Sequence, residues 1–387
     1  MNRSTRVASR LASLLLLAAT AIAQNPAEAQ SSPSPSAYVY VSSSTRANQY
    51  EINAYSAASN GSLSVIAGSP YAASVQYMAV NGKYLLGTDG IDISTFSLAS
   101  NGALQQISVT NAQQMNIPPG CGGPVAIFFD HTGSTLYDED FYGSGCANNS
   151  YQSFGVDSSS GMLSYVGATA AVTPDFDVPL SFIGNNQYAY GASCYHFFAS
   201  IFGFKRATSG TLTKLNTTPA LPTAPAGDFY CAYLAAADPN SNVAISLQPM
   251  NNQSWLTAGP TQLAVYTADN SGNLTTTSTS ANMPETLVGN VTDLRMAPSG
   301  KLLAVAGTGG LQIFHFNGAS PITRDTGLLT KAEIDQLYWD NANHLYALSR
   351  TTGKLFVFTI TPTSATQAPG SPYAIHEAVN IIVQPKS

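Results

Sequence analysis

A unit of about four short apolar runs recurs along this chain, and after Ala37 no stretch shows the sustained 3.6-residue periodicity of a helix. The runs are rich in Tyr, Val, Ile, Leu and Phe, and turns of Gly, Asn, Ser and Pro separate them, which is typical of β-strands. In many units a turn with Gly and a following Leu or Met opens the last run, as in Asn101-Gly102-Ala103-Leu104. Glycine supplies the positive φ that tight hairpin turns need.

A duplicated tetrapeptide sets the period of the repeat. Gly68-Ser69-Pro70-Tyr71 returns as Gly370-Ser371-Pro372-Tyr373, 302 positions later. Six repeats over that span give units of about 50 residues, the size of a four-stranded propeller blade. The repetition starts at a second strand, Tyr38 to Val41, and ends on an unaccompanied first strand, Val379 to Val383.

This permuted order predicts an all-β fold: a seven-bladed β-propeller with four-stranded antiparallel blades, in which the last strand of the chain completes the first blade. Such closure removes the exposed edges that an open array of sheets would leave. Two stacked β-sandwiches, the alternative, would not predict the permuted end. We expect one propeller at 37–387, with blade 1 from 37–74 plus 376–387 and the others at approximately 75–118, 119–173, 174–226, 227–287, 288–332 and 333–375.

The first 29 residues have the layout of a secretory signal peptide. A basic start precedes an apolar run from Leu11 to Ala23, and small-residue cleavage sites end at Ala23 and at Ala29. The run is shorter than the roughly 18 residues needed to span a bilayer. We therefore expect a cleaved peptide and no membrane span in the mature chain, a flexible leader at 30–36, and a secreted or periplasmic protein.

The charge balance limits the partners. Only 9 % of the residues are charged and the formal net charge is −6, whereas nucleic acid and anionic lipid both require a basic surface. Acidic residues predominate in the connections predicted to surround the site, so the expected partners are a small neutral or cationic ligand, a carbohydrate or a protein. We expect a monomer, and we predict neither a cofactor nor a metal site.

Candidate site residues follow from the topology, because second-to-third-strand loops and inter-blade connections share one face of a propeller. His376 and Glu377 could act there as base and orienter, or could form an ordinary polar connection. Asp293 and Arg295 lie two residues apart, on one strand face, and could orient a polar ligand or form a structural ion pair. Further candidate ligand-binding residues lie at or beside the starts of first strands: Tyr77, Asp335, Gln336 and Asn380.

The four cysteines all follow the signal peptide, and export favours oxidation. The predicted topology places all of them on the same face of the propeller. We predict disulfides between Cys121 and Cys146 and between Cys194 and Cys231. A zinc site is the alternative, but the spacings lack paired Cys-x-x-Cys units.

The repeats resemble the seven-bladed propellers of the lactonase family, which includes bacterial 6-phosphogluconolactonases and a muconate cycloisomerase. The resemblance rests on the Gly-Ser-Pro-Tyr segments, the Gly-x-Leu turns and the strand–Gly–Leu-Tyr hairpins, and it implies lactone hydrolysis in carbohydrate metabolism. Members thought to be active carry Gly-Pro-Arg-His at a first strand, where this chain has Gly123-Pro124-Val125-Ala126. Valine and alanine can neither polarise a lactone carbonyl nor move a proton.

Two functions therefore remain open. The first is an exported lactonase-like propeller that hydrolyses or binds a sugar-type lactone or carbohydrate at the channel mouth. If it is a lactone hydrolase, His376, Glu377, Asp293 and Arg295 are the candidates for proton transfer and carbonyl polarisation. The second is a non-catalytic extracellular or periplasmic propeller that binds protein or polysaccharide.

Overall fold

The two ends of the folded chain meet in one sheet. In the computed structural model, β30 (Ala378–Pro385) pairs antiparallel with β1 (Ala37–Arg46), so that Val39 lies opposite Val383 and Val41 opposite Ile381. The structure describes residues 34–46, 49–112, 124–140, 150–170, 179–195 and 198–386. The predicted signal peptide and most of the leader lie outside these residues. The predicted closure by the C-terminal strand is confirmed.

The described residues form seven antiparallel sheets, which are the blades of a propeller. Blade 1 contains, from the inside outward, β30, β1, β2 (Gln49–Ala57) and β3 (Leu63–Val65), with β4 (Tyr71–Ala72) also pairing with β2. Blade 2 contains β5 (Tyr77–Val80), β6 (Tyr84–Thr88), β7 (Asp92–Leu98) and β8 (Leu104–Asn111). Blade 3 contains β9 (Pro124–Phe129), β10 (Thr135–Asp140), β11 (Ser150–Val156) and β12 (Leu163–Ala170).

The remaining four blades follow in chain order. Blade 4 contains β13 (Ser181–Phe182), β14 (Tyr188–Tyr195), β15 (Phe198–Arg206) and β16 (Leu212–Lys214). Blade 5 contains β17 (Asp228–Ala237), β18 (Asn242–Asn251), β19 (Gln262–Ala268) and β20 (Leu274–Thr275). Blade 6 contains β21 (Val291–Met296), β22 (Leu302–Gly307), β23 (Gly310–Asn317) and β24 (Ser320–Arg324). Blade 7 contains β25 (Gln336–Trp339), β26 (His344–Ser349), β27 (Lys354–Thr361) and β28 (Ser364–Gln367), and β29 (Tyr373–Ala374) also pairs with β27.

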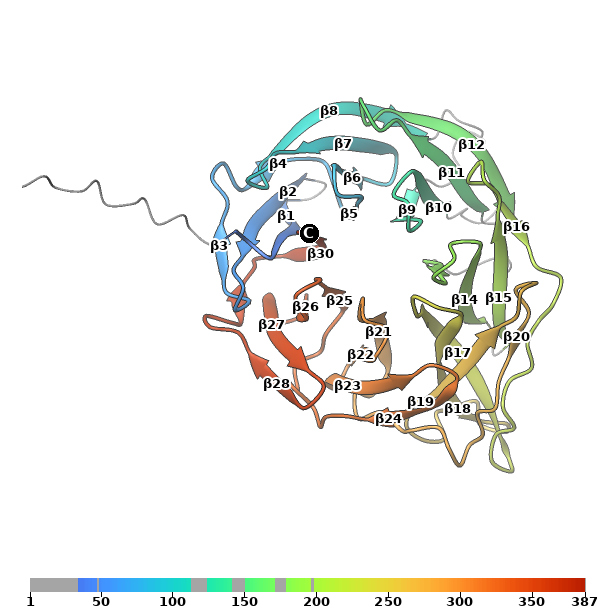
Figure 1. The fold of residues 1–387 in the computed structure, drawn as a ribbon. Helices are drawn as coiled ribbons and strands as arrows, with labels where there is room; N and C mark the ends of the chain where they lie inside the picture. The colour runs from blue at the N-terminus through green and yellow to red at the C-terminus, as the bar shows by residue number, and fades with distance from the viewer. Residues whose placement is uncertain are drawn as a thin grey trace, which may run out of the picture. The chain divides into compact units, whose positions relative to one another are not determined.

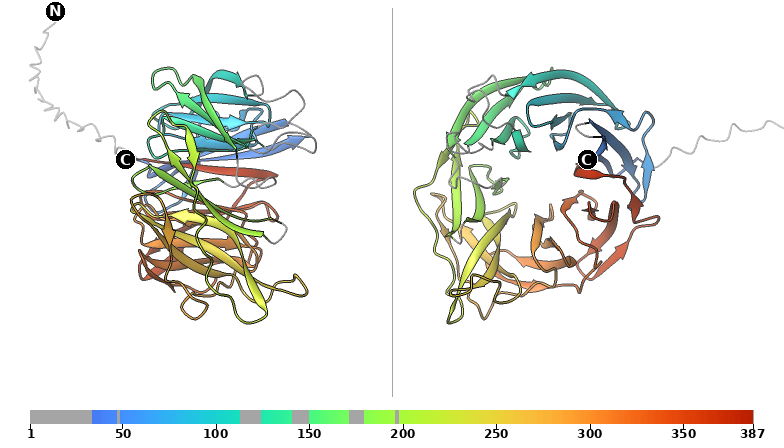
Figure 2. Two further views of the ribbon diagram at one scale, coloured as in Figure 1. Left: turned by 90° about the vertical axis from the view of Figure 1, so that its right-hand side faces the viewer. Right: turned by 180° about the vertical axis from the view of Figure 1, so that it is seen from behind.

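The blades surround a central channel, and the first strand of each blade lies nearest to it (Figure 1). The strands run between the two faces of the ring (Figure 2). We call the face that carries the first-to-second-strand turns, such as 81–83 and 130–134, the turn rim. The opposite face carries the second-to-third-strand hairpins and the inter-blade connections, such as 350–353 and 375–377, and we call it the loop rim. The site residues predicted from the sequence were expected at the loop rim.

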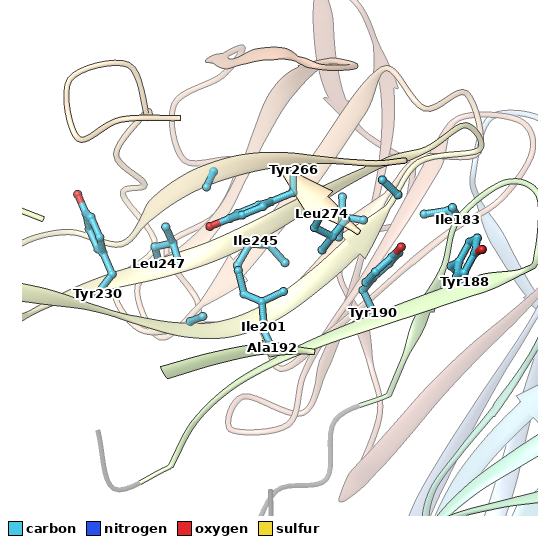
Figure 3. Close-up of a cluster of buried hydrophobic side chains, with 14 of the residues drawn as sticks. Ile183, Tyr188, Tyr190, Ala192, Ile201, Tyr230, Ile245, Leu247, Tyr266 and Leu274 are labelled. Carbon is cyan, nitrogen blue, oxygen red and sulfur yellow. The ribbon is translucent and has the colours of Figure 1, made fainter. Parts of the chain in front are cut away.

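Tyrosines tie neighbouring blades together at the turn rim. A tyrosine hydroxyl of one blade's second strand donates a hydrogen bond to a glycine carbonyl in the third-to-fourth-strand turn of the next blade. The pairs are Tyr40 to Gly102 (2.8 Å), Tyr137 to Gly210 (2.7 Å) and Tyr190 to Gly272 (2.8 Å). Around these bonds the blades pack through buried apolar clusters, such as the one between blades 4 and 5 that contains Tyr190, Ile245 and Tyr266 (Figure 3).

The glycine of these turns is required by space as well as by conformation. Gly102 has a φ of 82°, and a Cβ atom placed on it would lie 2.5 Å from the ring of Tyr38. The recurring Gly-x-Leu sequence is therefore the mark of a blade-to-blade contact.

The duplicated tetrapeptide also has a structural role. Ser69 Oγ accepts a hydrogen bond from the Ala54 backbone N–H at 2.8 Å, and Ser371 Oγ accepts one from the Val357 backbone N–H at 2.8 Å. The strands that follow, β4 and β29, pair with equivalent third strands of blades 1 and 7. Both copies thus fasten the connection that leads from the outer edge of a blade to the next first strand.

Candidate functional site

Three of the side chains predicted for the site, one as a catalytic candidate and two as ligand-binding residues, contact the next blade instead of open space. Each lies near the start of a first strand and accepts a hydrogen bond from a backbone N–H in the first strand of the following blade. The contacts are Asp293 Oδ2 with Leu337 N (2.8 Å), Gln336 Oε1 with Ile381 N (2.9 Å) and Asn380 Oδ1 with Met78 N (3.0 Å). The geometry thus gives Asp293, Gln336 and Asn380 a structural role at three consecutive blade junctions.

The other predicted residues of the loop rim are dispersed. His376 and Glu377 are exposed, and among the described residues no hydrogen bond or ion pair joins their side chains to each other, to Asp293 or to Arg295. Asp335 accepts a hydrogen bond from the Arg350 backbone N–H at 2.7 Å and pairs with the Arg350 guanidinium at 2.9 Å, so it holds the adjacent hairpin. Tyr77 is half-buried at the start of β5.

Of the residues predicted for the site, Arg295 lines a cavity in the central channel, which is described below. Its Nε atom lies 3.1 Å from Asp293 Oδ1, its guanidinium covers the ring of Tyr338 with 5.0 Å between the guanidinium carbon and the ring centroid, and its side chain is 39 % exposed. Burial opposes the charge, but Asp293 and Tyr338 raise the pKa of Arg295 above its ordinary value. Burial also raises the pKa of Tyr338, so its hydroxyl keeps its proton at neutral pH.

A cavity of about 480 Å³ begins at Arg295 and Tyr338 and extends along the channel to the turn rim. Its volume lies within the range of small-molecule sites, about 300–1,000 Å³. Much of its wall is apolar: Ala79, Val80, Ile127, Phe128, Phe129, Leu180, Phe182, Ile382 and Val383. The cavity thus opens at the face opposite to the one that the sequence indicated.

The aromatic part of this wall is held in place from behind. The Phe128 ring stacks on Tyr137, with 5.5 Å between centroids, and Phe182 lies 5.4 Å from the same tyrosine ring. Tyr338 lies two residues after the predicted site residue Gln336, on the same strand face. Continuing the alternation of this first strand by one step would have found it.

Several polar side chains of the cavity are already engaged within the protein. The Asp130 carboxylate pairs with Arg206 at 2.5 Å and accepts a hydrogen bond from Asn186. Asn81 donates to the Gly133 carbonyl at 2.8 Å. Partial removal from water, beside Phe182, lowers the pKa of His131 against the opposing effect of Asp130, so its imidazole is neutral at pH 7.

The predicted disulfide between Cys194 and Cys231 is present. It joins β14 of blade 4 to β17 of blade 5, with 5.2 Å between the Cα atoms. The other predicted pair, Cys121 and Cys146, lies outside the described residues. Within the described ranges, no cluster of three His, Cys, Asp or Glu side chains is arranged to hold a metal ion, and no helix is long and apolar enough to cross a membrane.

Comparison with known proteins shows which solved structures share this architecture. No family model matches the chain, and no curated protein matches its sequence. Among solved structures, the periplasmic gluconolactonase PpgL of Pseudomonas aeruginosa superposes with a TM-score of 0.64 at 15 % identity, over 90 % of this chain and 99 % of that one. A protein provisionally named a 6-phosphogluconolactonase, from Bacteroides fragilis, gives a TM-score of 0.64 at 14 % identity, over 93 % and 99 %.

The chain has the fold of the lactonase-like propellers. The resemblance inferred from the repeats is therefore confirmed at the level of fold. A hypothetical selenium-binding protein from Sulfolobus tokodaii shares the architecture, with a TM-score of 0.62 at 10 % identity over 91 % of this chain and 94 % of that one. Because one propeller architecture carries different functions, the function of this propeller has to be argued from its own cavity.

Proposed function

We propose that this lactonase-like propeller binds a small organic molecule in its channel cavity and that Arg295 contacts a carbonyl or carboxylate oxygen of that ligand. The partly exposed Arg295 side chain, which lines the cavity, carries the proposal. Asp293 engages its Nε atom, and among the described residues neither terminal nitrogen has a hydrogen-bond acceptor. Two parallel N–H donors of an arginine match the oxygens of a carboxylate.

We further propose that the protein binds its ligand without hydrolysing it. The Asp293 carboxylate accepts hydrogen bonds from Leu294 N, Leu337 N and Arg295 Nε, which leaves it poorly placed to take a proton from water. A hydrolase would need such a base within hydrogen-bond reach of the reacting water.

The test combines binding with turnover. Thermal denaturation of the disulfide-intact protein, with and without sugar lactones, aliphatic lactones and their open acids, should show stabilisation by at least one ligand. This stabilisation should disappear in Arg295→Met and persist in Arg350→Met, which removes an arginine paired with Asp335 outside the cavity. Lactone hydrolysis, followed by acid release, should not exceed the buffer rate. Turnover that His376→Ala abolishes would instead restore the hydrolase hypothesis.

We also propose that the protein is exported from the cytoplasm and that its signal peptide is removed. The Cys194–Cys231 bond supports this, because disulfides persist in oxidising compartments, and PpgL is described as periplasmic. Fractionation of cells that express the full chain should place it outside the cytoplasm, and its N-terminal sequence should begin at Gln24 or Gln30. A full-length protein in the cytoplasm would contradict the proposal.

A second function, binding of a polysaccharide or protein at the loop rim, is favoured by the connection between β18 and β19. Trp255 is 49 % exposed and Leu256 is 67 % exposed just beyond β18. Exposed tryptophan rings suit stacking on sugar rings or on a partner's apolar side chains. Retardation of the protein in gels that contain soluble polysaccharides should fall in Trp255→Ser and not in Val65→Ser, a variant at another exposed apolar position. Equal mobility with and without every polysaccharide would exclude the carbohydrate version.

A further inference from the structure

We propose that the channel ligand is an amphipathic monocarboxylate, a single carboxylate on an aromatic or alicyclic body, and not a polyhydroxylated sugar acid or lactone. This inference rests on the proposed binding function of the channel and names the ligand class. It depends on three properties of the cavity: a wall that is apolar in large part, polar side chains of which several are already engaged, and one cationic group.

The apolar wall faces the arginine. Phe128 belongs to β9 and Arg295 to β21, and these strands lie on opposite sides of the channel (Figure 1). Phe128 and Phe182 are braced by Tyr137 behind them, so the wall is preformed. A ligand whose carboxylate meets Arg295 therefore directs the rest of its body toward aromatic and aliphatic side chains. Burial of an apolar body there is favourable in proportion to the area removed from water.

The polar side chains of the wall offer little to a sugar. Asp130 is committed to Arg206 and Asn186, Asn81 to backbone groups of its own turn and of Gly133, and Ser181 accepts a hydrogen bond from the Ala237 backbone N–H at 2.7 Å. A sugar loses hydrogen bonds to water when it is bound, and each hydroxyl without a partner in the site weakens binding. Gln384 Oε1 lines the cavity without a hydrogen-bond partner among the described residues, so the wall can accept a bond from a single ligand hydroxyl but offers few partners to a body that carries many.

The charges favour one carboxylate per ligand. Among the described residues that line the cavity, Arg295 is the only arginine or lysine. The Asp130 carboxylate is balanced by Arg206 behind the wall. A second carboxylate on the ligand would lie near Asp293 or Asp130 without a cation of its own, which is costly in a partly desolvated site.

The experiment compares matched ligands by isothermal titration calorimetry on the disulfide-intact protein. Phenylacetate is the test ligand, phenylacetamide replaces its carboxylate by a neutral group of similar shape, and gluconate keeps the carboxylate on a polyhydroxylated body. We expect phenylacetate to bind at least about 10-fold more tightly than either of the others, because a hydrogen bond to a charged group outweighs a neutral one.

Three variants locate the site. Arg295→Met should weaken phenylacetate binding by about 10- to 100-fold, and Arg295→Lys, which keeps the charge but loses the planar fork, should weaken it less. Val80→Thr places a hydroxyl in the wall at nearly constant volume and should also weaken phenylacetate binding. Arg350→Met, outside the cavity, should leave it unchanged. If Arg295→Met does not fold, Arg295→Lys and Val80→Thr carry the test.

The outcomes separate the two proposals. If gluconate or a sugar lactone binds as tightly as phenylacetate and depends on Arg295, the ligand class is wrong while channel binding stands. If no carboxylate or lactone binds in an Arg295-dependent manner, both proposals are wrong.

Discussion

Substitution of Gly102 by alanine tests whether the glycine turns fasten one blade to the next. Gly102 and Gly90 both lie in blade 2 with positive φ, 82° and 95°, but a Cβ at Gly90 would meet no atom within 4 Å whereas one at Gly102 would lie 2.5 Å from Tyr38. Alanine in the left-handed region costs roughly 1–2 kcal/mol at either position. At Gly102 the crowding against Tyr38 adds about 1–3 kcal/mol, as overpacking of a core does.

The expected free energy of unfolding therefore falls by about 1–2 kcal/mol in Gly90→Ala and by about 2–5 kcal/mol in Gly102→Ala. Equilibrium urea denaturation of both variants and the wild type, followed by tryptophan fluorescence, measures the difference if the m-values agree. Only the excess loss at Gly102 reports the blade contact, because the conformational cost is common to both. Equal losses in the two variants would refute the argument that the turn glycine is selected by the neighbouring blade.

Three further outcomes are expected. Asn380→Ala leaves the buried N–H of Met78 without its acceptor and should lower the free energy of unfolding by about 1–3 kcal/mol. Asn380→Asp keeps an acceptor oxygen and should lose less of this free energy. Equal losses in the two variants would argue against the role of Asn380 in joining two blades. Replacing Cys194 and Cys231 by serine removes a crosslink across 37 residues and should cost about 4 kcal/mol by loop entropy. A reducing agent should lower the stability of the wild type by at least as much, because it also breaks the predicted Cys121–Cys146 bond, and no loss in the variant would contradict the expectation. The pKa of His131 is lowered in the folded state, so the unfolded chain binds more protons below about pH 6.5 and stability should fall as the pH drops through that region. In His131→Gln the fall in Tm between pH 7.5 and 5.5 should be smaller than in the wild type. An identical fall would contradict the lowered pKa of His131.

The architecture could be predicted from the sequence because the order of strands within the repeat determines how the blades are connected. The start at a second strand, near Tyr38, and the end on a lone first strand, near Val383, can be reconciled only by a closed ring, and the structure has that closure. The Cys194–Cys231 pair followed for the same reason, since strand order alone brings both ends to one rim.

The site was harder to predict because a polar residue at the start of a first strand suits two partners equally well. Asp293 and Asn380 could face a ligand or a neighbouring backbone N–H, and sequence does not distinguish these. The structure shows the backbone contact. The end of the channel that stays open depends on how far side chains such as Phe128 and Tyr338 fill it, which is a property of packing in three dimensions.

The position of β30 has a consequence for how the chain is made. The inner strand of the first blade, β30, is separated from its partner β1 by the sequence of all the other blades, so until the ribosome has made β30 the edge of β1 stays unpaired and the ring stays open. A nascent chain of this kind has to be kept from pairing with other chains through that edge, and a truncation before Ala378 would leave every molecule in that state.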